Sequence, residues 1–475
     1  MSNWRADSSR KISRRFVIEG ELVLDTPASF SSGETNATEI VILEDERARL
    51  PLIPGASLAG ALRHYLVTRE LGFRHPDERP DGQKTLATLL FGEALDDGST
   101  RTESRVIAHD ALGEGKLTRR EGVKIAGKTR TADDGMLFST QVWETNTRFK
   151  LRFELVLFKE DTDDFIAGFA GALNALGRGE ISLGGRKQRG YGRVHIENWH
   201  VSFYDMSSAV AVGAWLQNRR MSNMMQDFFA LGDNLIDRRQ FIHVAALVQI
   251  QDSILIRTAS DVADNEHLTS NTRPILSGTS VTGALRARAL KIANTVFADY
   301  SRAEHIVNDM FGHHGTEGNQ NLTASRLTVE EHPIENGRFQ YIQNRIKIDR
   351  FTGGAFETAL FSERPLFADN STVVQVNLML RYPANTYEQE ILQAQTGLLL
   401  LVLKDLWTED LPLGGEASIG RGRLKGLQAT IAFKYADHDR PFVVELDEAG
   451  LVDASLAGDM QTYVQALWNY GGQPV

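Results

Sequence analysis

The chain has 475 residues, which is too long for one ordinary domain and fits two or three. Its 42% hydrophobic and 24% charged residues exclude a disordered or collagen-like chain, and the absence of cysteine excludes disulfides, zinc–thiolate sites and iron–sulfur clusters. A net charge of −10 argues against non-specific coating of nucleic acid but allows a local basic groove. Because no apolar run reaches 18 residues and the first residues lack a signal-peptide core, we expect a cytoplasmic protein without membrane contact.

In chain order, the first half begins with an apolar strand at 16–24, which a long loop follows. The spacing of Leu58 and Leu62 with the apolar residues around them predicts an amphipathic helix. Alternating apolar and charged residues over 148–157 predict a half-buried strand with a mostly basic outer face. A second helix at 163–176 and a strand after a glycine-rich loop complete a β-α-β-β-α-β order.

The second half repeats the first. Six landmarks recur in the same order about 220 to 230 residues later, and a period this long indicates two whole domains in tandem. The matched pairs are PGASLAGALR with SGTSVTGALR, LLFG with DMFG, SRVIAHDA with SRLTVEEH, VKIAGKT with IKIDRFT, MLFS with ALFS, and LGGRKQRGYGR with LGGEASIGRGR.

The repeat and the element order predict an α+β fold of two tandem ferredoxin-like (RRM-like) domains with extra inserted hairpins. We place the first domain at 12–206 and the second at 238–435. The linker at 207–237 is expected to hold one or two short helices. In the acidic extension at 436–475, residues 459–470 predict a helix that docks on a neighbouring subunit, and the final GGQPV is expected to be loose.

The glycine-rich loop is the strongest local motif. Four glycines in nine residues permit positive φ and close backbone approach, and successive N–H groups can face an anion. Cations and a tyrosine add charge and base stacking, whereas a tight solvated turn is the alternative. Glu416 replaces Arg186 in the second copy and predicts a weaker contact there. The predicted RNA contacts are Gly184, Gly185, Arg186, Lys187, Arg189, Gly190, Tyr191, Gly192 and Arg193 in the first copy, and Gly414, Gly415, Gly420, Gly422 and Arg423 in the second.

Each domain also has a conspicuous helix start. Its free N–H groups and positive potential suit a phosphate. Ser57 and Ser280 either add a hydroxyl contact or simply cap the helix. Arg63 and Arg286 are either phosphate contacts or ordinary surface arginines.

A third motif is the stretch RIKIDRFTGG, which precedes ALFSER. Its Lys347 and Arg350, and Lys124 in the twin stretch, are either RNA contacts or solvated hairpin charges. These three motifs, present twice in the same order, resemble the RAMP superfamily, in particular the backbone subunits of type III CRISPR effector complexes. IPGASLAG, RIKIDRFTGGA with LFSER, and GGRKQRGYGR carry the resemblance. A tandem fusion of this kind is most similar to the double-backbone subunit of the type III-D variant.

The resemblance implies a subunit that holds guide RNA (crRNA) and complementary target RNA beside other CRISPR effector subunits, with thumb hairpins that interrupt the duplex. It also implies a metal-dependent endoribonuclease. An aspartate after strand one promotes attack of the ribose 2′-OH on its own phosphate, with a divalent metal such as Mg²⁺. Asp264 is the best match for that aspartate and Asp261 the second. Glu39 falls at the family spacing in domain one, which is therefore expected to be weakly active or inert.

Two alternatives stay open. The chain is either a scaffold that binds the same RNA without chemistry, or a guide-RNA-processing endonuclease in which His313 and His314 act as general acid and base. The same histidine pair has no carboxylates at ligand spacing, which argues against a metal site there. No Walker loop, G-x-S-x-G elbow or H-E-x-x-H motif occurs.

Overall fold

The computed structural model divides the chain into two compact units. Unit one comprises Met1–Arg119, Phe138–Lys187 and Tyr191–Arg239. Unit two comprises Arg120–Leu137, Gln188–Gly190 and Gln240–Val475. The structure describes residues 11–36, 39–74, 85–92, 103–125, 132–297, 299–313, 323–384, 389–435 and 441–472.

Unit one is built on a six-stranded antiparallel sheet of order β10-β1-β9-β6-β4, with β5 also paired to β9. The predicted strands at 16–24 and 148–157 lie in β1 and β9, where one face of alternating residues is buried. The strands are β1 (Ile12–Leu24), β4 (Leu52–Ile53), β5 (Val106–Ala108), β6 (Ala111–Glu114), β9 (Arg148–Phe158) and β10 (Val194–Asp205).

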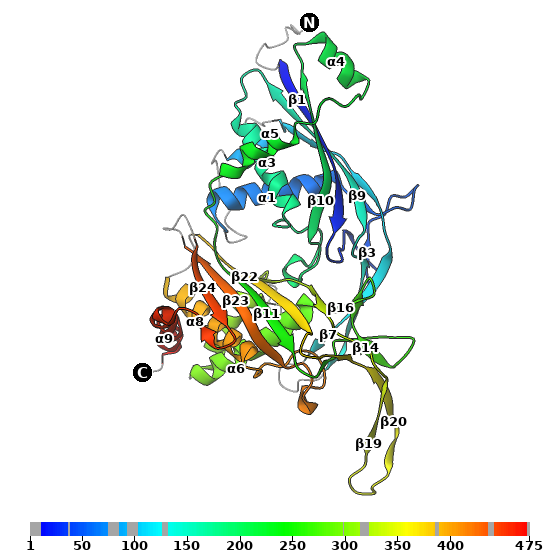
Figure 1. The fold of residues 1–475 in the computed structure, drawn as a ribbon, viewed down its shortest axis with the longest axis vertical. Helices are drawn as coiled ribbons and strands as arrows, with labels where there is room; N and C mark the ends of the chain where they lie inside the picture. Colours follow the sequence, from blue (N-terminus) through cyan, green and yellow to red (C-terminus); the bar gives the residue numbers. More distant parts are fainter. Residues whose placement is uncertain are drawn as a thin grey trace. The chain divides into compact units, whose positions relative to one another are not determined.

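Helices α1, α3 and α5 lie on one side of this sheet, whereas α4 lies apart from them (Figure 1) and packs through Ala211 and Ala214 on Val17 and Tyr204 in a separate cluster. Leu58 and Leu62 of α1 share a buried cluster with Ile18 and Leu22 of β1, and each fully buried leucine contributes about 2 kcal/mol. The linker forms two short helices, as predicted. The helices are α1 (Gly55–Leu71), α2 (Leu86–Phe91), α3 (Asp164–Gly177), α4 (Ala209–Leu216) and α5 (Met225–Ala230), with 3₁₀ turns η2 (Lys187–Arg189) and η3 (Leu231–Asn234).

The opposite face of this sheet is not the basic surface that the sequence predicts. Arg148 of β9 lies 2.8 Å from both Glu21 and Glu197, and Arg152 lies 3.1 Å from Glu19. Strands β1 and β10 therefore supply the carboxylates that neutralise β9. Because these partners come from distant parts of the chain, the local sequence pattern of β9 could not show them.

Unit two repeats the plan with a nine-stranded sheet of order β15-β16-β18-β22-β11-β23-β24-β25, with β17 also paired to β22. Strand β11 again lies between two antiparallel neighbours, β22 and β23. The strands are β11 (Gln240–Ile250), β15 (Thr269–Ser270), β16 (Arg273–Leu276), β17 (Leu327–Val329), β18 (His332–Glu335), β22 (Val373–Tyr382), β23 (Leu424–Lys434), β24 (Phe442–Asp447) and β25 (Gly450–Leu451).

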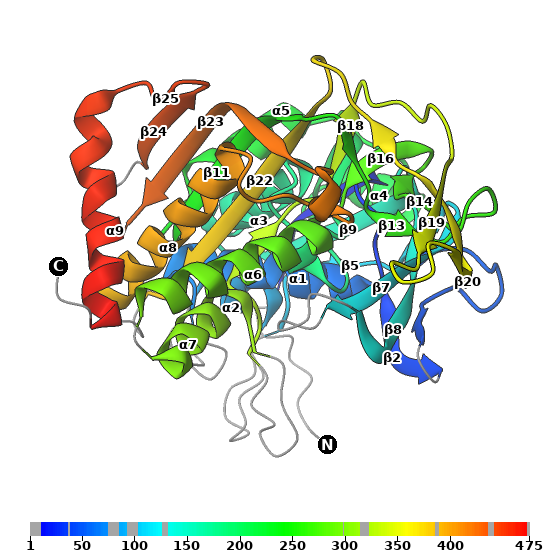
Figure 2. The same ribbon diagram turned by 90° about the horizontal axis from the view of Figure 1, so that it is seen from below.

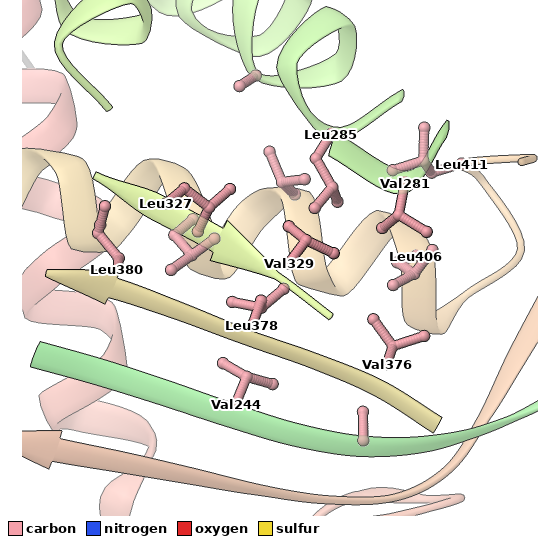
Figure 3. Packing of buried hydrophobic residues seen from close by; sticks show 14 of the residues in the cluster. Val244, Val281, Leu285, Leu327, Val329, Val376, Leu378, Leu380, Leu406 and Leu411 are labelled. Carbon is pink, nitrogen blue, oxygen red and sulfur yellow. The ribbon is translucent and has the colours of Figure 1, made fainter. Parts of the chain in front are cut away.

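Helices of unit two cover this sheet and form its core with it. Val281 and Leu285 of α6 point toward Val329 and Leu378 on the strands below (Figure 3). Figure 2 shows α6 and α7 beside one another under the sheet. The helices are α6 (Gly278–Val296), α7 (Tyr300–Phe311), α8 (Gln389–Trp407) and α9 (Ala457–Gly471), with 3₁₀ turns η4 (Ala417–Ile419) and η5 (Ala454–Leu456).

The predicted helix at 459–470 forms as α9, but it packs on its own unit. Figure 2 shows α9 alongside α8. A Cβ on Gly397 of α8 would lie 2.1 Å from the Tyr463 carbonyl oxygen, so only glycine permits this close approach. Tyr463 also accepts a hydrogen bond of 2.8 Å from the Tyr435 hydroxyl. One face of α9 is therefore covered by its own unit, and docking of this helix on a neighbouring subunit stays a prediction for its other face.

Each repeat also carries a four-stranded insertion of the same order, β2-β3-β8-β7 and β13-β14-β20-β19. In both, a strand of the loop after strand one runs parallel to one strand of a hairpin. The β19–β20 hairpin extends past β14 as a two-stranded arm (Figure 1). The strands are β2 (Ser31–Asn36), β3 (Glu39–Ile42), β7 (Leu117–Ile125), β8 (Ala132–Trp143), β13 (Arg257–Thr258), β14 (Asn265–His267), β19 (Gln343–Ile348) and β20 (Ala355–Arg364), and a separate pair is β12 (Ser253–Ile254) with β21 (Leu366–Phe367).

The two large sheets are thus antiparallel and helices accompany each, which confirms a mixed α and β architecture. Among the helices that the structure describes, none has the length and apolar character needed to cross a bilayer.

Candidate RNA interface and cleavage loop

The glycine-rich loop of unit one is a tight turn. Two of its main-chain N–H groups already donate hydrogen bonds within the protein. The N–H of Gly185 donates to the Ser29 carbonyl at 2.8 Å, and that of Gly192 to the Pro27 carbonyl at 2.9 Å. A Cβ on Gly192 would lie 1.8 Å from the Leu183 carbonyl oxygen. These two N–H groups therefore build the turn and do not face an anion. Left-handed φ angles also occur at Gly184, Gly190, Gly414, Gly420 and Gly422.

Some cationic side chains of this loop contact other parts of the protein and are not fully available to RNA. The Arg186 guanidinium stacks over the Phe138 ring at 4.7 Å, and burial lowers its pKa. Tyr191 is only 6% exposed, so its ring has no free face and the predicted base stacking does not fit. Lys187 is exposed and Arg193 half-buried, and their RNA contacts stay predictions.

The loop tip belongs to unit two. A Cβ on Gly190 would lie 2.4 Å from the Glu331 main-chain nitrogen, and the Arg189 carbonyl oxygen lies against Gly278. Packing of main chain on main chain explains why glycine occurs at position 190.

The second glycine-rich loop holds its acidic residue inside the protein. Glu416 accepts a hydrogen bond of 2.6 Å from Arg421 Nε and lies 3.3 Å from Arg345 Nε. Arg421 itself is 4% exposed. The negative charge of Glu416 is therefore neutralised within unit two and is not presented to a phosphate. Arg423 is exposed at the end of this loop. An RNA phosphate could therefore reach its side chain, and the contact stays a prediction.

Neither helix start is capped by a serine side chain. The N–H of Gly55 donates to the Asp110 carboxylate at 2.7 Å, and Ser57 lies exposed beside it. Helix α6 likewise has no side-chain cap at Ser277. The capping alternative for Ser57 and Ser280 is wrong, and both hydroxyls stay predicted RNA contacts.

The two helix arginines differ in their surroundings. Arg63 is exposed. Arg286 donates to the Gly312 carbonyl at 2.7 Å and to the Asn308 side chain, and burial lowers its pKa. Because Arg286 holds the end of α7, the RNA contact predicted for it does not fit this geometry.

The tip of the β19–β20 hairpin is organised by Asp349. Its carboxylate accepts from the Phe351 N–H and the Thr352 hydroxyl, both at 2.9 Å, and the Phe351 N–H is the main cause of its lowered pKa. Lys347 lies over the Phe356 ring at 4.7 Å, and exposed Arg350 follows Asp349. The arm thus carries two predicted RNA contacts. Lys124 lies in β7, and its side chain is outside the described residues.

Asp264 is bound to the base of this hairpin. Its Oδ2 accepts from the Ser362 main-chain N–H at 2.7 Å and from the Ser362 hydroxyl at 2.9 Å, and its own N–H donates to that hydroxyl at 3.0 Å. The main-chain N–H and then the hydroxyl lower the pKa of Asp264, which is exposed and therefore ionised at neutral pH. Asp261 is also exposed in this loop, three residues before Asp264.

A buried ion-pair cluster lies directly beside Ser362. Glu363 is 0% exposed, with Arg257 Nη2 at 2.9 Å and Arg345 Nε at 3.4 Å from its two oxygens. Burial raises the pKa of Glu363, and neighbouring Glu416 raises it further against the opposing effect of Arg257. The cluster joins the loop after β11, the hairpin base and the glycine-rich loop. Of the predicted motifs in unit two, the structure thus brings these three together.

His267 fixes the other end of β14. It is fully buried, its Nδ1 accepts from the Ile256 N–H at 3.2 Å, and its Nε2–H donates to the Ile275 carbonyl at 3.1 Å. Burial lowers its pKa to about 4, so the ring is neutral at pH 7. With both ring nitrogens occupied, His267 has a structural role.

This neutral histidine makes stability depend on pH. In the unfolded chain its pKa is about 6.5, so its contribution is complete above that value and is lost as the pH falls toward 4. We expect a loss of up to about 3 kcal/mol from this group. The measurement is urea unfolding at pH 7 and 4.5 for the wild type and for His267→Gln, which retains an amide donor but does not titrate. Equal losses in the two proteins would contradict the assignment.

Glu39 occupies in unit one the place that Asp264 occupies in unit two. Strand β3 pairs with β8 at Glu39↔Ser139, and β14 pairs with β20 at Asn265↔Glu363, one residue after Asp264 and Ser362. The two registers are therefore equivalent. The Glu39 side chain is outside the described residues, but the Ser139 hydroxyl is buried and has no hydrogen-bond partner in the part of the chain that is described.

The described side chains around Asp264 do not supply enough ligands to hold a metal ion by themselves. The described residues contain no cluster of three or more His, Cys, Asp or Glu side chains. His313 forms a bridge with Thr323, and His314 lies outside the described residues. One free Asp264 oxygen fits only an ion that takes its other ligands from water and phosphate, as Mg²⁺ commonly does.

The sequence singled out Asp264 but not the residues around it, namely Ser362, which bonds it, and the Glu363–Arg257 ion pair beside Ser362. The repeated landmark MLFS and ALFS was the available signal, since both copies end in the serine that lies opposite the candidate carboxylate.

These features define a duplicated α/β protein in which each repeat joins a glycine-rich loop to a hairpin beside one carboxylate loop. A comparison with protein-family models matches the RAMP superfamily over residues 21–195 and 260–425. The chain belongs to the RAMP superfamily, with one match in each repeat. A search of curated proteins gave no match. Membership of this superfamily indicates a CRISPR-associated, RNA-binding subunit.

Proposed function

We propose that the chain is a guide-RNA-binding backbone subunit of a type III CRISPR ribonucleoprotein, as a tandem fusion that resembles the type III-D double-backbone variant. Two ferredoxin-like domains with thumb hairpins are part of this proposal. The strand orders β10-β1-β9-β6 and β23-β11-β22-β18 support it, since each places strand one between the last strand and the third. The β19–β20 arm is the thumb of the second repeat.

We further propose that unit two cleaves target RNA paired to the guide. One observation carries this: the ionised Asp264 carboxylate is exposed, and the base of the arm that would interrupt the duplex holds it in place. Such a carboxylate is a poor proton acceptor at pH 7 because its pKa is lowered. Its role is to orient the reacting ribose and phosphate by charge and position.

The reaction is an internal transfer. The 2′-oxygen forms a bond to the adjacent phosphorus as the bond from phosphorus to the 5′-oxygen breaks. The 2′-proton goes to solvent, and the leaving 5′-oxygen takes a proton from solvent. The products are a 2′,3′-cyclic phosphate and a 5′-hydroxyl. A divalent ion, when bound, supplies positive charge that stabilises the attacked phosphate, and Asp264 is the residue that would hold it.

A scaffold without chemistry is the second candidate. The hydrogen bonds between Asp264 and Ser362 favour it, because they also fit a purely structural link between the loop and the hairpin. Target cleavage by the assembled complex decides between the two, as set out in the Discussion.

Guide binding is tested by removing the two cations of the arm. Lys347→Ala with Arg350→Ala should reduce the slope of log affinity against log salt by about 1.4, because each lost phosphate contact on single-stranded RNA contributes about 0.7. The measurement is titration of labelled guide RNA at several salt concentrations. Lys404→Ala with Lys425→Ala, which removes two cations already paired with Asp410 and Glu448, is the matched control. Equal slopes in both variants would contradict an RNA contact on the arm.

A further inference from the structure

The hydroxyl and N–H of Ser362 converge on one oxygen of Asp264. Both donors reach Oδ2, at 2.9 and 2.7 Å, which leaves Oδ1 free of these bonds. The third bond, from the Asp264 N–H back to the hydroxyl at 3.0 Å, closes a small ring between loop and hairpin. This arrangement fixes the side chain about its χ angles and determines which oxygen is available.

The position of Ser362 is fixed by the ion pairs of the next residue in β20. Its neighbour Glu363 is buried and lies between Arg257 of β13 and Arg345 of β19. The parallel pairing of Asn265 with Glu363 continues this connection along the main chain. A side chain that must orient a reacting group needs such a rigid support, because an error of about 1 Å costs roughly a hundredfold in rate.

Repeat one has a serine in the equivalent register. Ser139 lies opposite Glu39 in the equivalent register, yet its buried hydroxyl has no partner among the described residues. Thr140 follows it where Glu363 follows Ser362, and the Thr140 hydroxyl is also buried, without a partner in the described part of the chain. The Ser362 hydroxyl of repeat two, by contrast, is bonded to Asp264, and a buried hydroxyl without a partner costs about 1–3 kcal/mol.

We infer that Ser362 is a positioning residue that presents Oδ1 of Asp264 to the target RNA, and that this aspartate–serine pair, which the sequence of repeat one replaces with glutamate and serine, distinguishes repeat two from repeat one. The inference rests on the proposed cleavage function and adds the residue that directs it. Glutamate is one methylene longer than aspartate, and a reacting group misplaced by about 1 Å can lose roughly a hundredfold in rate.

The first test changes the hydroxyl. Ser362→Ala should lower the single-turnover rate of the Asp264-dependent cut about 10- to 100-fold while target affinity stays the same. Ser362→Thr, which keeps a hydroxyl and suits a strand, should recover most of the rate. Loss of target binding in Ser362→Ala, or equal rates for the alanine and threonine variants, would overturn the positioning role.

A second measurement does not depend on cleavage. Hydrogen exchange of the loop at 258–267 should be faster in Ser362→Ala than in the wild type and Ser362→Thr, because the hydroxyl joins the loop to the hairpin. Unchanged exchange in the alanine variant would overturn the inference even if no variant cuts RNA. If the wild-type complex does not cleave but exchange follows the hydroxyl, the proposed cleavage fails while the link between Ser362 and Asp264 stands.

The third test restores the pair in repeat one. In the assembled complex, Glu39→Asp should add a cut that depends on Ser139, at the position where repeat one holds the target. The double variant Glu39→Asp with Ser139→Ala is the matched control and should lack that cut. A complex whose unit-two cut is intact but that gains nothing from Glu39→Asp would overturn the claim about repeat one.

Discussion

Replacing Asp264 by asparagine should abolish one cut in the target RNA, with a rate loss of at least about 100-fold. Asparagine has nearly the same size and can still accept a hydrogen bond from the Ser362 N–H, so the loop should keep its shape. Only the negative charge is removed. Target affinity should change by no more than a few-fold, because base pairing and backbone contacts provide it.

The assay is gel analysis of labelled target RNA cut by the assembled complex, with end-group analysis for a 2′,3′-cyclic phosphate and a chelator lane for metal dependence. Asp261→Ala is the matched control, since Asp261 is exposed in the same loop, whereas Asp264 is the carboxylate that Ser362 holds. If Asp261→Ala removes the cut and Asp264→Asn does not, the alignment of the loop is wrong. If neither variant alters the pattern, unit two is a scaffold.

Gly422→Ala should destabilise the protein by about 3 kcal/mol or more. The residue has φ of 74°, and a Cβ there would lie 1.9 Å from the Leu413 carbonyl oxygen. The Leu413 N–H also donates to the Gly422 carbonyl at 2.8 Å, so the two residues cannot separate without losing that bond. Left-handed backbone strain and the steric overlap both oppose alanine.

The control for this substitution lies in the same loop. Gly420 has φ of 94°, but a Cβ there would meet nothing within 4 Å. Gly420→Ala should therefore cost only the conformational term, about 1–2 kcal/mol. Urea unfolding of both variants separates the two terms, and equal losses would show that the close approach at Gly422 contributes nothing.

Much of the fold was predictable because local periodicity reports burial. The spacing of Leu58, Leu62 and Tyr65 predicts α1, and all three side chains are buried. The apolar run at 241–250 forms β11, the central strand of its sheet. The repeat was visible because whole motifs recur in order. These patterns depend only on residues close together in the sequence, so they can be read without knowledge of tertiary contacts.

The candidate site was less predictable because its partners are distant in sequence. Asp264 and Ser362 are 98 residues apart, and Arg148 meets Glu21 across 127 residues. No spacing rule connects such pairs. Composition likewise could not show that Tyr191 would be buried or that Arg286 would hold the end of α7. Residue type indicated the chemistry, but tertiary packing decided which of those residues are accessible.

Arg186 and Glu416 occupy equivalent places in the two glycine-rich loops, and each has its own set of neighbours. Arg186 and Glu416 share a left-handed backbone, with φ of 55° and 61°. A carboxylate at 186 would face the electron-rich Phe138 ring in place of a cation, and an arginine at 416 would lie beside Arg345 and Arg421. An exchange of the residues at 186 and 416 is therefore tolerable only if the residues that contact them are exchanged as well. The two halves are therefore no longer interchangeable parts, and grafting either loop onto the other half should fail unless its partners move with it.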